Sequence, residues 1–367
     1  MRGVTKVFTI FGIDIQLHYS WWFILIFLSW ALSKNFFPDF FPGYTSGTYW
    51  LMGISAALLL FISVLLHELS HSLVAKVQKI KVESITLFFF GGVAGITKED
   101  IKPRSEFLMA IAGPLFSLFL GGVFYLINRS QINGIITAIT FYLYQLNFIL
   151  AIFNMVPGYP LDGGRAFRAI LYWHYKDLKK ATKIAAGVGK FFAGFLIILG
   201  IFGLINGIGN GLWFILLGGF LYFIAGVSYN QVVLKDLLDK VPIKDLISKK
   251  VPTVKPEMKL KVFMKKYANT DEDVFLVKGK NFSGLLDLKR LGSVPDKMQD
   301  IVKLQQVALP LDKVKGINKG ENAYSAFKKF STQNLDLLPV LDKGKVIGIV
   351  RRSTLMNRLQ WKLSSNK

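Results

Sequence analysis

The sequence predicts a polytopic α-helical membrane protein of about six transmembrane helices, with a membrane-associated β-hairpin and a cytosolic α/β domain. Hydrophobic residues make up 52% of the 367 residues, and the mean hydropathy is +0.42. Both values exceed those of ordinary soluble domains. Long apolar runs end near residue 230, and a charged, mixed-polarity sequence follows. We therefore expect a transmembrane domain over 1–230 and a cytosolic domain over 231–367.

Six apolar runs are the candidate membrane spans, because each has few or no charged residues. A seventh segment, 80–96, is too short to span as a helix and is rich in β-branched and aromatic residues around Gly91 and Gly92. We expect this segment to form a β-hairpin at the membrane face. The expected spans are 17–32, 50–75, 107–127, 135–153, 184–205 and 212–229.

The formal net charge of +22 is unevenly distributed along the chain. Lysines and arginines gather on the side of the membrane that holds the N-terminus, in segments 76–81, 98–104 and 165–183, and are scarce in the opposite loops. By the positive-inside rule, both termini lie in the cytoplasm and the protein resides in the cytoplasmic membrane. Nucleic-acid binding would instead need basic residues on one folded face, so we expect the lipid bilayer as a partner of the protein and no nucleic acid.

The chain has no cysteine and only four histidines, His18, His67, His71 and His174. Disulfides and cysteine-ligated metal sites are therefore excluded, and a metal site must use His, Asp or Glu. His67 to His71 reads H-E-L-S-H, an H-E-x-x-H motif. On a helix this spacing puts both imidazoles on one face, about 6 Å apart along the axis, within reach of one zinc ion. Glu68 can then take a proton from an activated water.

A catalytic zinc needs a third protein ligand, and the best candidate lies in the segment NMVPGYPLDGGR, residues 154–165. This segment follows the fourth span on the cytoplasmic side, so Asp162 is expected at the depth of the two motif histidines. Asn154 can donate an amide hydrogen bond to a developing oxyanion. His18 and His174 have no partner at ligand spacing and are expected at the membrane interface.

With these two motifs in this order, residues 1–230 resemble the site-2 protease family of intramembrane zinc metalloproteases. The resemblance implies one zinc ion per chain, bound by His67, His71 and Asp162, with Glu68 as general base and acid and Asn154 assisting the transition state. It also implies regulated intramembrane proteolysis of membrane-anchored or signal-peptide-like substrates. The segment Gly91, Gly92, Val93, Ala94 and Gly95 would supply an edge strand that pairs with an unwound substrate.

One further family element, Ile111 to Pro114, precedes Ser117. Many relatives carry Asn at this last position, so we assign packing rather than catalysis to Ser117.

The cytosolic domain contains an internal repeat, because the sequences after Val274 and Leu337 share one pattern of strand, turn, strand and helix start. It resembles a pair of CBS modules, at about 241–295 and 300–360, which implies a homodimer through the CBS pair. Nucleotide binding is expected to be weak or absent, because neither module keeps the Ser/Thr and Asp pair that holds a ribose. Those positions are Asp287 and Arg290, and Arg351 and Thr354.

Two other functions compete with proteolysis. An ion-conducting transporter would also place ionisable residues inside the membrane, but it predicts polar residues along several spans, and these are sparse. A catalytically inactive scaffold would normally have lost a ligand or Glu68, whereas His67, Glu68, His71 and Asp162 are all present.

Overall fold

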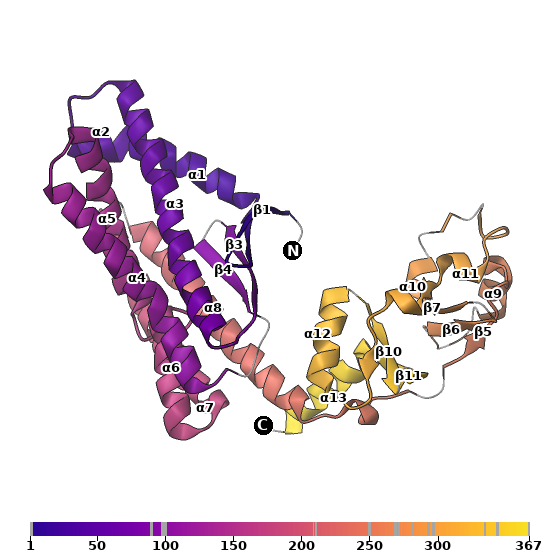
Figure 1. Ribbon diagram of the computed structural model, residues 1–367. Coiled ribbons are helices and arrows are strands. Elements are labelled where there is room, and N and C mark those ends of the chain that lie inside the picture. Colours follow the sequence, from indigo (N-terminus) through magenta and orange to yellow (C-terminus); the bar gives the residue numbers. More distant parts are fainter. Residues whose placement is uncertain are drawn as a thin grey trace. The chain divides into compact units, whose positions relative to one another are not determined.

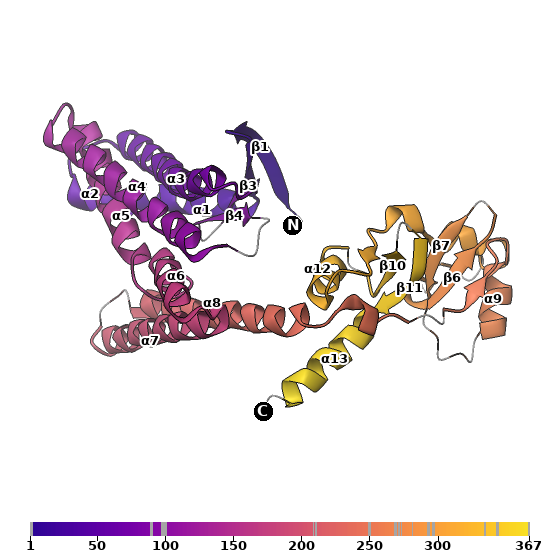
Figure 2. The same ribbon diagram turned by 60° about the horizontal axis from the view of Figure 1, so that its bottom comes forward.

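The computed structural model describes residues 3–88, 91–96, 101–207, 209, 211–248, 251–267, 270, 272, 274–280, 282–291, 294–295, 298–333, 335–342 and 345–365. The chain forms two compact units, Met1–Val232 and Val233–Lys367. Figures 1 and 2 show the helices of the first unit and the mixed α/β structure of the second from two directions.

Five of the described helices are long and apolar enough to cross a membrane. The protein is thus a multi-pass membrane protein, as the apolar runs predict. The short helix α6 (Asp162–Tyr175) lies between the third and fourth of them in the chain. The five are α3 (Ser46–Val77), α4 (Pro103–Arg129), α5 (Gly134–Asn154), α7 (Leu178–Ile205) and α8 (Gly211–Asp239).

The first expected span, 17–32, differs from the structure. Its initial residues belong to a strand, and helix α1 (Ser20–Ala31) has only 12 residues, fewer than the roughly 20 that a span needs. The helical path continues through a π-helix, η1 (Leu32–Phe36), and then α2 (Phe37–Phe40). Five of the described helices are thus each long enough to span the membrane alone, and the continuous helical path of α1, η1 and α2 is the remaining candidate for the first expected span.

A four-stranded sheet of order β1-β2-β3-β4 packs beside the helices. The predicted hairpin at 80–96 is present as β3 (Val82–Phe88) and β4 (Gly91–Ile96). A second hairpin, β1 (Val4–Ile10) and β2 (Ile13–His18), was not predicted, and β2 pairs in parallel with β3. Strand β4 consequently lies at one edge of the sheet.

The sheet is held against the helix that carries the H-E-x-x-H motif. Ile15 and Ile85 form one buried cluster with Leu69 of α3 and Met109 of α4. Figure 1 shows β3 and β4 lying along α3. Because Leu69 stands between the two motif histidines, this contact places the sheet next to them.

The second unit contains two similar modules, each a small sheet flanked by helices. The first has sheet order β5-β6-β7-β8 and the second β11-β10-β9. The first module is β5 (Thr253–Val254), α9 (Leu260–Tyr267), β6 (Val274–Lys278), β7 (Ser283–Asp287), α10 (Leu288–Leu291), α11 (Leu304–Val307) and β8 (Leu309–Pro310). The second is β9 (Ile317–Asn318), α12 (Ala323–Gln333), β10 (Leu337–Asp342), β11 (Lys345–Arg351) and α13 (Arg352–Ser365).

Each module differs from its expected range, 241–295 or 300–360, because it includes a segment from beyond the boundary between them. Strand β8 pairs with β7 of the first module, although it follows residue 300. Leu238 and Ile243 lie in the core of the second module, together with the buried Phe330. This exchange explains why each module is not a simple contiguous stretch of chain.

Candidate metal centre

Helix α3 presents His67 and His71 on one face, as the four-residue spacing predicts. Both are buried, with 3% and 5% of their surface exposed. Their ring centroids lie 4.8 Å apart. Two imidazoles buried in an apolar helix need strong partners, because unpaired polar groups there cost several kcal/mol.

Asp162 meets both imidazoles, although it lies more than 90 residues away in the chain. It is the first residue of α6, following the N-cap residue Leu161. Its Oδ2 atom lies 3.2 Å from Nε2 of His67 and 3.1 Å from Nε2 of His71. The two Nε2 atoms are themselves 3.2 Å apart. Among the described residues, these three form the one group of at least three His, Asp or Glu with the geometry of a metal site.

The three atoms fit a metal ion better than a hydrogen-bond cluster. Nδ1 of His71 contacts the carbonyl oxygen of Met109 at 2.5 Å. Since a carbonyl can only accept, this nitrogen carries the proton and Nε2 of a neutral His71 presents a lone pair. A second imidazole nitrogen and a carboxylate oxygen face the same point. Ligand atoms about 2.0–2.1 Å from a tetrahedral ion are roughly 3.3 Å from one another, close to the separations observed.

Helix α4 closes the other side of the cluster with Gly113 and Ser117. A Cβ atom added at Gly113 would lie 2.2 Å from Nε2 of His71 and 2.6 Å from Nε2 of His67. Position 113 therefore accommodates no side chain larger than the hydrogen atom of glycine. Fully buried Ser117 was expected to act in packing, yet its Oγ also lies 2.8 Å from Nδ1 of His67, within hydrogen-bond distance. When His67 donates this bond, its Nε2 is left free to bind a metal.

The segment before α6 holds Asp162 in place by close backbone packing. A Cβ at Gly163 would meet the carbonyl oxygen of Met155 at 2.3 Å, and one at Gly164 would meet the backbone of Gly158 at 2.2 Å. Residues larger than glycine at these two positions would push the loop away from α6. Asp162 is also 3.7 Å from the guanidinium of Arg165.

A buried ion pair links α6 to α4. The guanidinium of Arg168 donates to Glu106, from Nε at 2.8 Å and also from Nη2. Desolvation alone would lower the pKa of Arg168, but Tyr159 and Glu106 raise it on balance, so the guanidinium stays charged. Removing one partner would leave a buried charge, which typically costs about 3–5 kcal/mol. The pair therefore fixes α6, and with it Asp162, against α4.

Glu68, which follows His67 on α3, contacts the edge strand β4. A Cβ added at Gly92 would lie 2.4 Å from Cγ of Glu68 and 3.1 Å from its Cδ. The backbone of β4 is therefore in direct contact with the Glu68 side chain. An extended peptide that paired with β4 would run close to this carboxylate.

The remaining expected site residues have fewer contacts. Asn154 is the last residue of α5, is partly buried and makes no side-chain hydrogen bond to a described residue. Gly91 to Gly95 lie in β4, but the side chains of Val93 and Ala94 are outside the described part of the structure. His18, on β2, bonds to Ser20 rather than to the cluster. Of these residues, only Gly92 contacts the site through a described residue.

Comparisons with known proteins point to one chemistry. The chain matches the family model "Peptidase family M50" over residues 55–133 and 127–199, and the CBS domain model over residues 308–360. A putative zinc metalloprotease of Synechocystis sp. is 33% identical, over 98% of this chain and 96% of that protein. A zinc metalloprotease of Methanocaldococcus jannaschii is 29% identical, over 98% and 97%. A solved structure, the site-2 protease from Methanocaldococcus jannaschii, is 33% identical over 62% of this chain and 95% of that one, with a TM-score of 0.43.

Proposed function

Because the chain belongs to peptidase family M50, the site-2 protease family, and is a zinc metalloprotease, we propose that it performs regulated intramembrane proteolysis. In this proposal it cuts peptide bonds within or next to the transmembrane segment of membrane-anchored or signal-peptide-like substrates. The observation that carries the proposal is the cluster of His67, His71 and Asp162, buried among apolar helices beside Glu68.

Nε2 of His67, Nε2 of His71 and a carboxylate oxygen of Asp162 would hold one zinc ion per chain. A zinc ion held there would supply Lewis-acid polarisation of the scissile carbonyl and would lower the pKa of water toward neutrality. Glu68 accepts the proton of the attacking water and returns it to the leaving amine. The amide of Asn154 is free of other described partners and donates to the developing oxyanion.

Strand β4 holds the substrate in extended form. A transmembrane helix hides its peptide bonds, so it must unwind before hydrolysis, and an edge strand can pair with the exposed backbone. Gly91, Gly92, Val93, Ala94 and Gly95 lie on the edge strand, and Gly92 contacts Glu68. This contact supports a path in which the paired backbone passes next to the proton carrier.

Both termini and the mouth of the site lie on the cytoplasmic side of the cytoplasmic membrane. The lysines and arginines between the spans support this orientation, because they gather on the side of the N-terminus.

The proposal is tested by reconstituting the purified protein with single-span substrates in lipid vesicles. Mass spectrometry of the products should place the cut within or next to the apolar segment, and a zinc chelator should stop cleavage. Cuts confined to soluble regions far from the bilayer would contradict intramembrane proteolysis while leaving the zinc protease chemistry intact.

We expect Ser117→Ala to weaken zinc binding by about 10- to 100-fold, the usual effect of removing a residue that orients a metal-binding histidine. Its hydroxyl is the one described partner of Nδ1 of His67. Chelator competition measures the zinc affinity without reference to activity. Ser63→Ala is the matched control, since Ser63 is equally buried one helical turn before His67 on α3. Equal affinities in the two variants would show that Ser117 serves packing alone.

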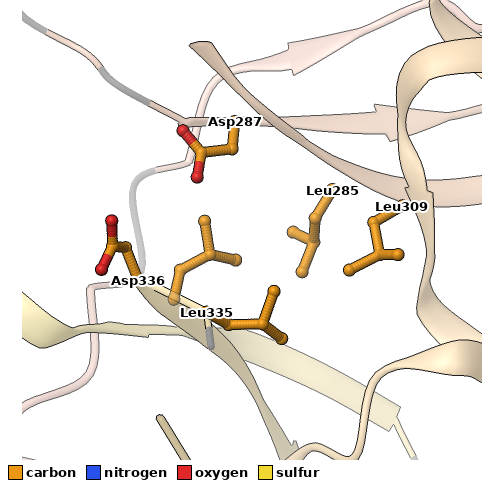
Figure 3. Close-up of a pocket in the computed structure, with 6 residues that line it drawn as sticks. Leu285, Asp287, Leu309, Leu335 and Asp336 are labelled. Atoms are coloured by element: carbon orange, nitrogen blue, oxygen red, sulfur yellow. The ribbon is translucent and has the colours of Figure 1, made fainter. Parts of the chain in front are cut away.

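The CBS pair acts as a regulatory and homodimerising module rather than as a nucleotide sensor. A cavity of about 250 Å³ between its modules is lined by Asp287, Asp336, Arg351 and Arg352, among others. Arg351 is paired with Glu272, and Arg352 with Asp336. Figure 3 shows a second, smaller pocket that shares Asp287 and Asp336 with this cavity and is otherwise lined by leucines, including Leu285, Leu309 and Leu335. Arginines already paired with carboxylates are poorly placed to bind a phosphate.

We therefore expect ATP to bind the full-length protein with a dissociation constant of about 1 mM or weaker. Calorimetric titration with ATP, ADP and AMP measures this value. Glu272→Gln and Asp336→Asn should strengthen the binding by releasing a guanidinium, whereas Asp342→Asn, which affects a surface pair with Lys319, should not. Micromolar ATP affinity in the unmodified protein would overturn this assignment. Thr354 is exposed, and the Arg290 side chain lies outside the described residues.

A further inference from the structure

A hollow of about 570 Å³ lies between the end of α3 and the start of α4, and none of its lining residues belongs to the metal centre. Its lining residues come from the end of α3, the turn that follows it and the first turns of α4. Its described lining residues include three cations and no acidic residue. The lining residues are Val77, Gln78, Lys79, Ile80, Ile101, Lys102, Arg104, Ser105 and Leu108.

The three cations are not neutralised by the described residues around them. Lys79, Lys102 and Arg104 are all exposed, and none forms an ion pair or cation–π contact with a described residue. Nearby lysines behave differently, since Lys76 donates to the carbonyl oxygen of Phe11 and Lys81 pairs with Glu83. Three positive charges that have no acidic partner among the described residues, gathered around one hollow, favour a multiply bonded anion.

The start of α4 adds to this preference. Its N-cap residue, Lys102, provides no side-chain cap, so N–H groups of the first turn have no capping acceptor from that residue. The acidic residue of that turn, Glu106, is buried and occupied by Arg168. A helix start that lacks a side-chain cap from its N-cap residue and carries the positive end of the helix dipole favours a phosphate.

The apolar part of the lining identifies the source of the phosphate. Val77 is 85% exposed and Leu108 is 38% exposed. Both stand at the ends of helices long and apolar enough to cross the membrane, where acyl chains meet the headgroup layer. An inorganic phosphate would leave these two side chains without a partner, whereas a phospholipid covers them with its chains.

We propose that this hollow binds an anionic phospholipid, with the headgroup phosphate held by Lys79, Lys102 and Arg104 and the acyl chains lying against Val77 and Leu108. Basic pockets between membrane helices commonly bind acidic headgroups in this way. The bound lipid links the C-terminal end of α3, which carries the H-E-x-x-H motif, to the N-terminal end of α4. It thus stabilises the pairing of the two helices that surround the metal centre.

The test is native mass spectrometry of the full-length protein released from detergent, titrated with phosphatidylglycerol or phosphatidylcholine. We expect one phosphatidylglycerol to bind at least about tenfold more tightly than phosphatidylcholine, which has no net charge. The triple substitution Lys79→Gln, Lys102→Gln and Arg104→Gln should remove this preference. The matched control is the triple substitution Lys176→Gln, Lys179→Gln and Lys183→Gln, which removes the same charge from the α6–α7 region. This control should retain the preference for phosphatidylglycerol.

Two further measurements distinguish a lipid site from a site for inorganic phosphate. Val77→Ser should weaken phosphatidylglycerol binding without affecting the fold, because Val77 is almost fully exposed. Inorganic phosphate at about 10 mM should compete poorly, since it gains nothing from the apolar lining. The proposal is overturned by equal losses in the two triple variants, by equal affinity for the two lipids, or by full displacement with inorganic phosphate.

Discussion

Glu68→Gln should lower the rate of peptide hydrolysis by about 10²- to 10⁴-fold, the usual contribution of a general acid–base group, while the protein keeps its zinc. The amide has nearly the shape of the carboxylate but cannot accept a proton. None of the three clustered atoms of His67, His71 and Asp162 is changed. Cleavage of a reconstituted single-span substrate and zinc content, measured on the same preparation, check both halves of this expectation.

Glu83→Gln provides the control, because Glu83 is an exposed acid on β3 that pairs with Lys81 and lies outside the cluster. The Glu83→Gln protein should cleave the substrate at the same rate as the protein without substitutions. Unimpaired cleavage by Glu68→Gln would exclude Glu68 as the proton carrier. Loss of zinc together with loss of activity would instead give Glu68 a structural role.

The metal cluster could be predicted from sequence because each part has a strong local signal. The four-residue spacing of His67 and His71 places both rings on one helix face wherever that helix is packed. The depth of Asp162 in the membrane could be predicted from topology, because the span before it returns the chain to the cytoplasmic side. The family and the chain's zinc protease class are confirmed by the comparisons. The roles of the individual residues remain predictions that the geometry supports.

The N-terminal hairpin was missed although its signal is present. Ile13, Ile15 and Leu17 alternate with polar residues, as a half-buried strand requires, and Phe11 and Gly12 both have positive φ in the turn. The following run of aromatic and aliphatic residues obscured this short pattern and extended the predicted span back to Leu17. Moreover, the parallel pairing of β2 with β3 joins segments about 70 residues apart. Local periodicity cannot reveal such a contact.

The role of Ser117 could not be predicted because it depends on three-dimensional contact. A serine four residues after Gly113 in an apolar helix is a common packing residue, and nothing in its neighbours indicates a histidine partner. Only the packing of α4 against α3 brings its hydroxyl to Nδ1 of His67. The same packing explains why position 113 must be glycine, which is the basis of the last prediction.

Gly113→Ala should reduce zinc affinity by more than about 100-fold, beyond the usual effect of losing an indirect contact. The added methyl carbon would lie 2.2 Å from Nε2 of His71, 2.5 Å from its Cε1 and 2.6 Å from Nε2 of His67. Contacts this short do not occur between non-bonded atoms, so α4 or the imidazoles must move. Helix α4 is held by the buried pair of Glu106 with Arg168, and the imidazoles are therefore expected to move. Their nitrogens would then no longer converge on Asp162.

Gly122→Ala is the matched control, because Gly122 lies on the same helix and a Cβ added there meets nothing within 4 Å. It should retain full zinc affinity. Zinc affinity is measured by chelator competition, and thermal unfolding in detergent verifies that both variants are folded. A folded Gly113→Ala protein with unchanged zinc affinity would mean that zinc is held elsewhere than between His67 and His71. That result would also remove the basis for the expected effect of Ser117→Ala, since both predictions depend on the same imidazole positions.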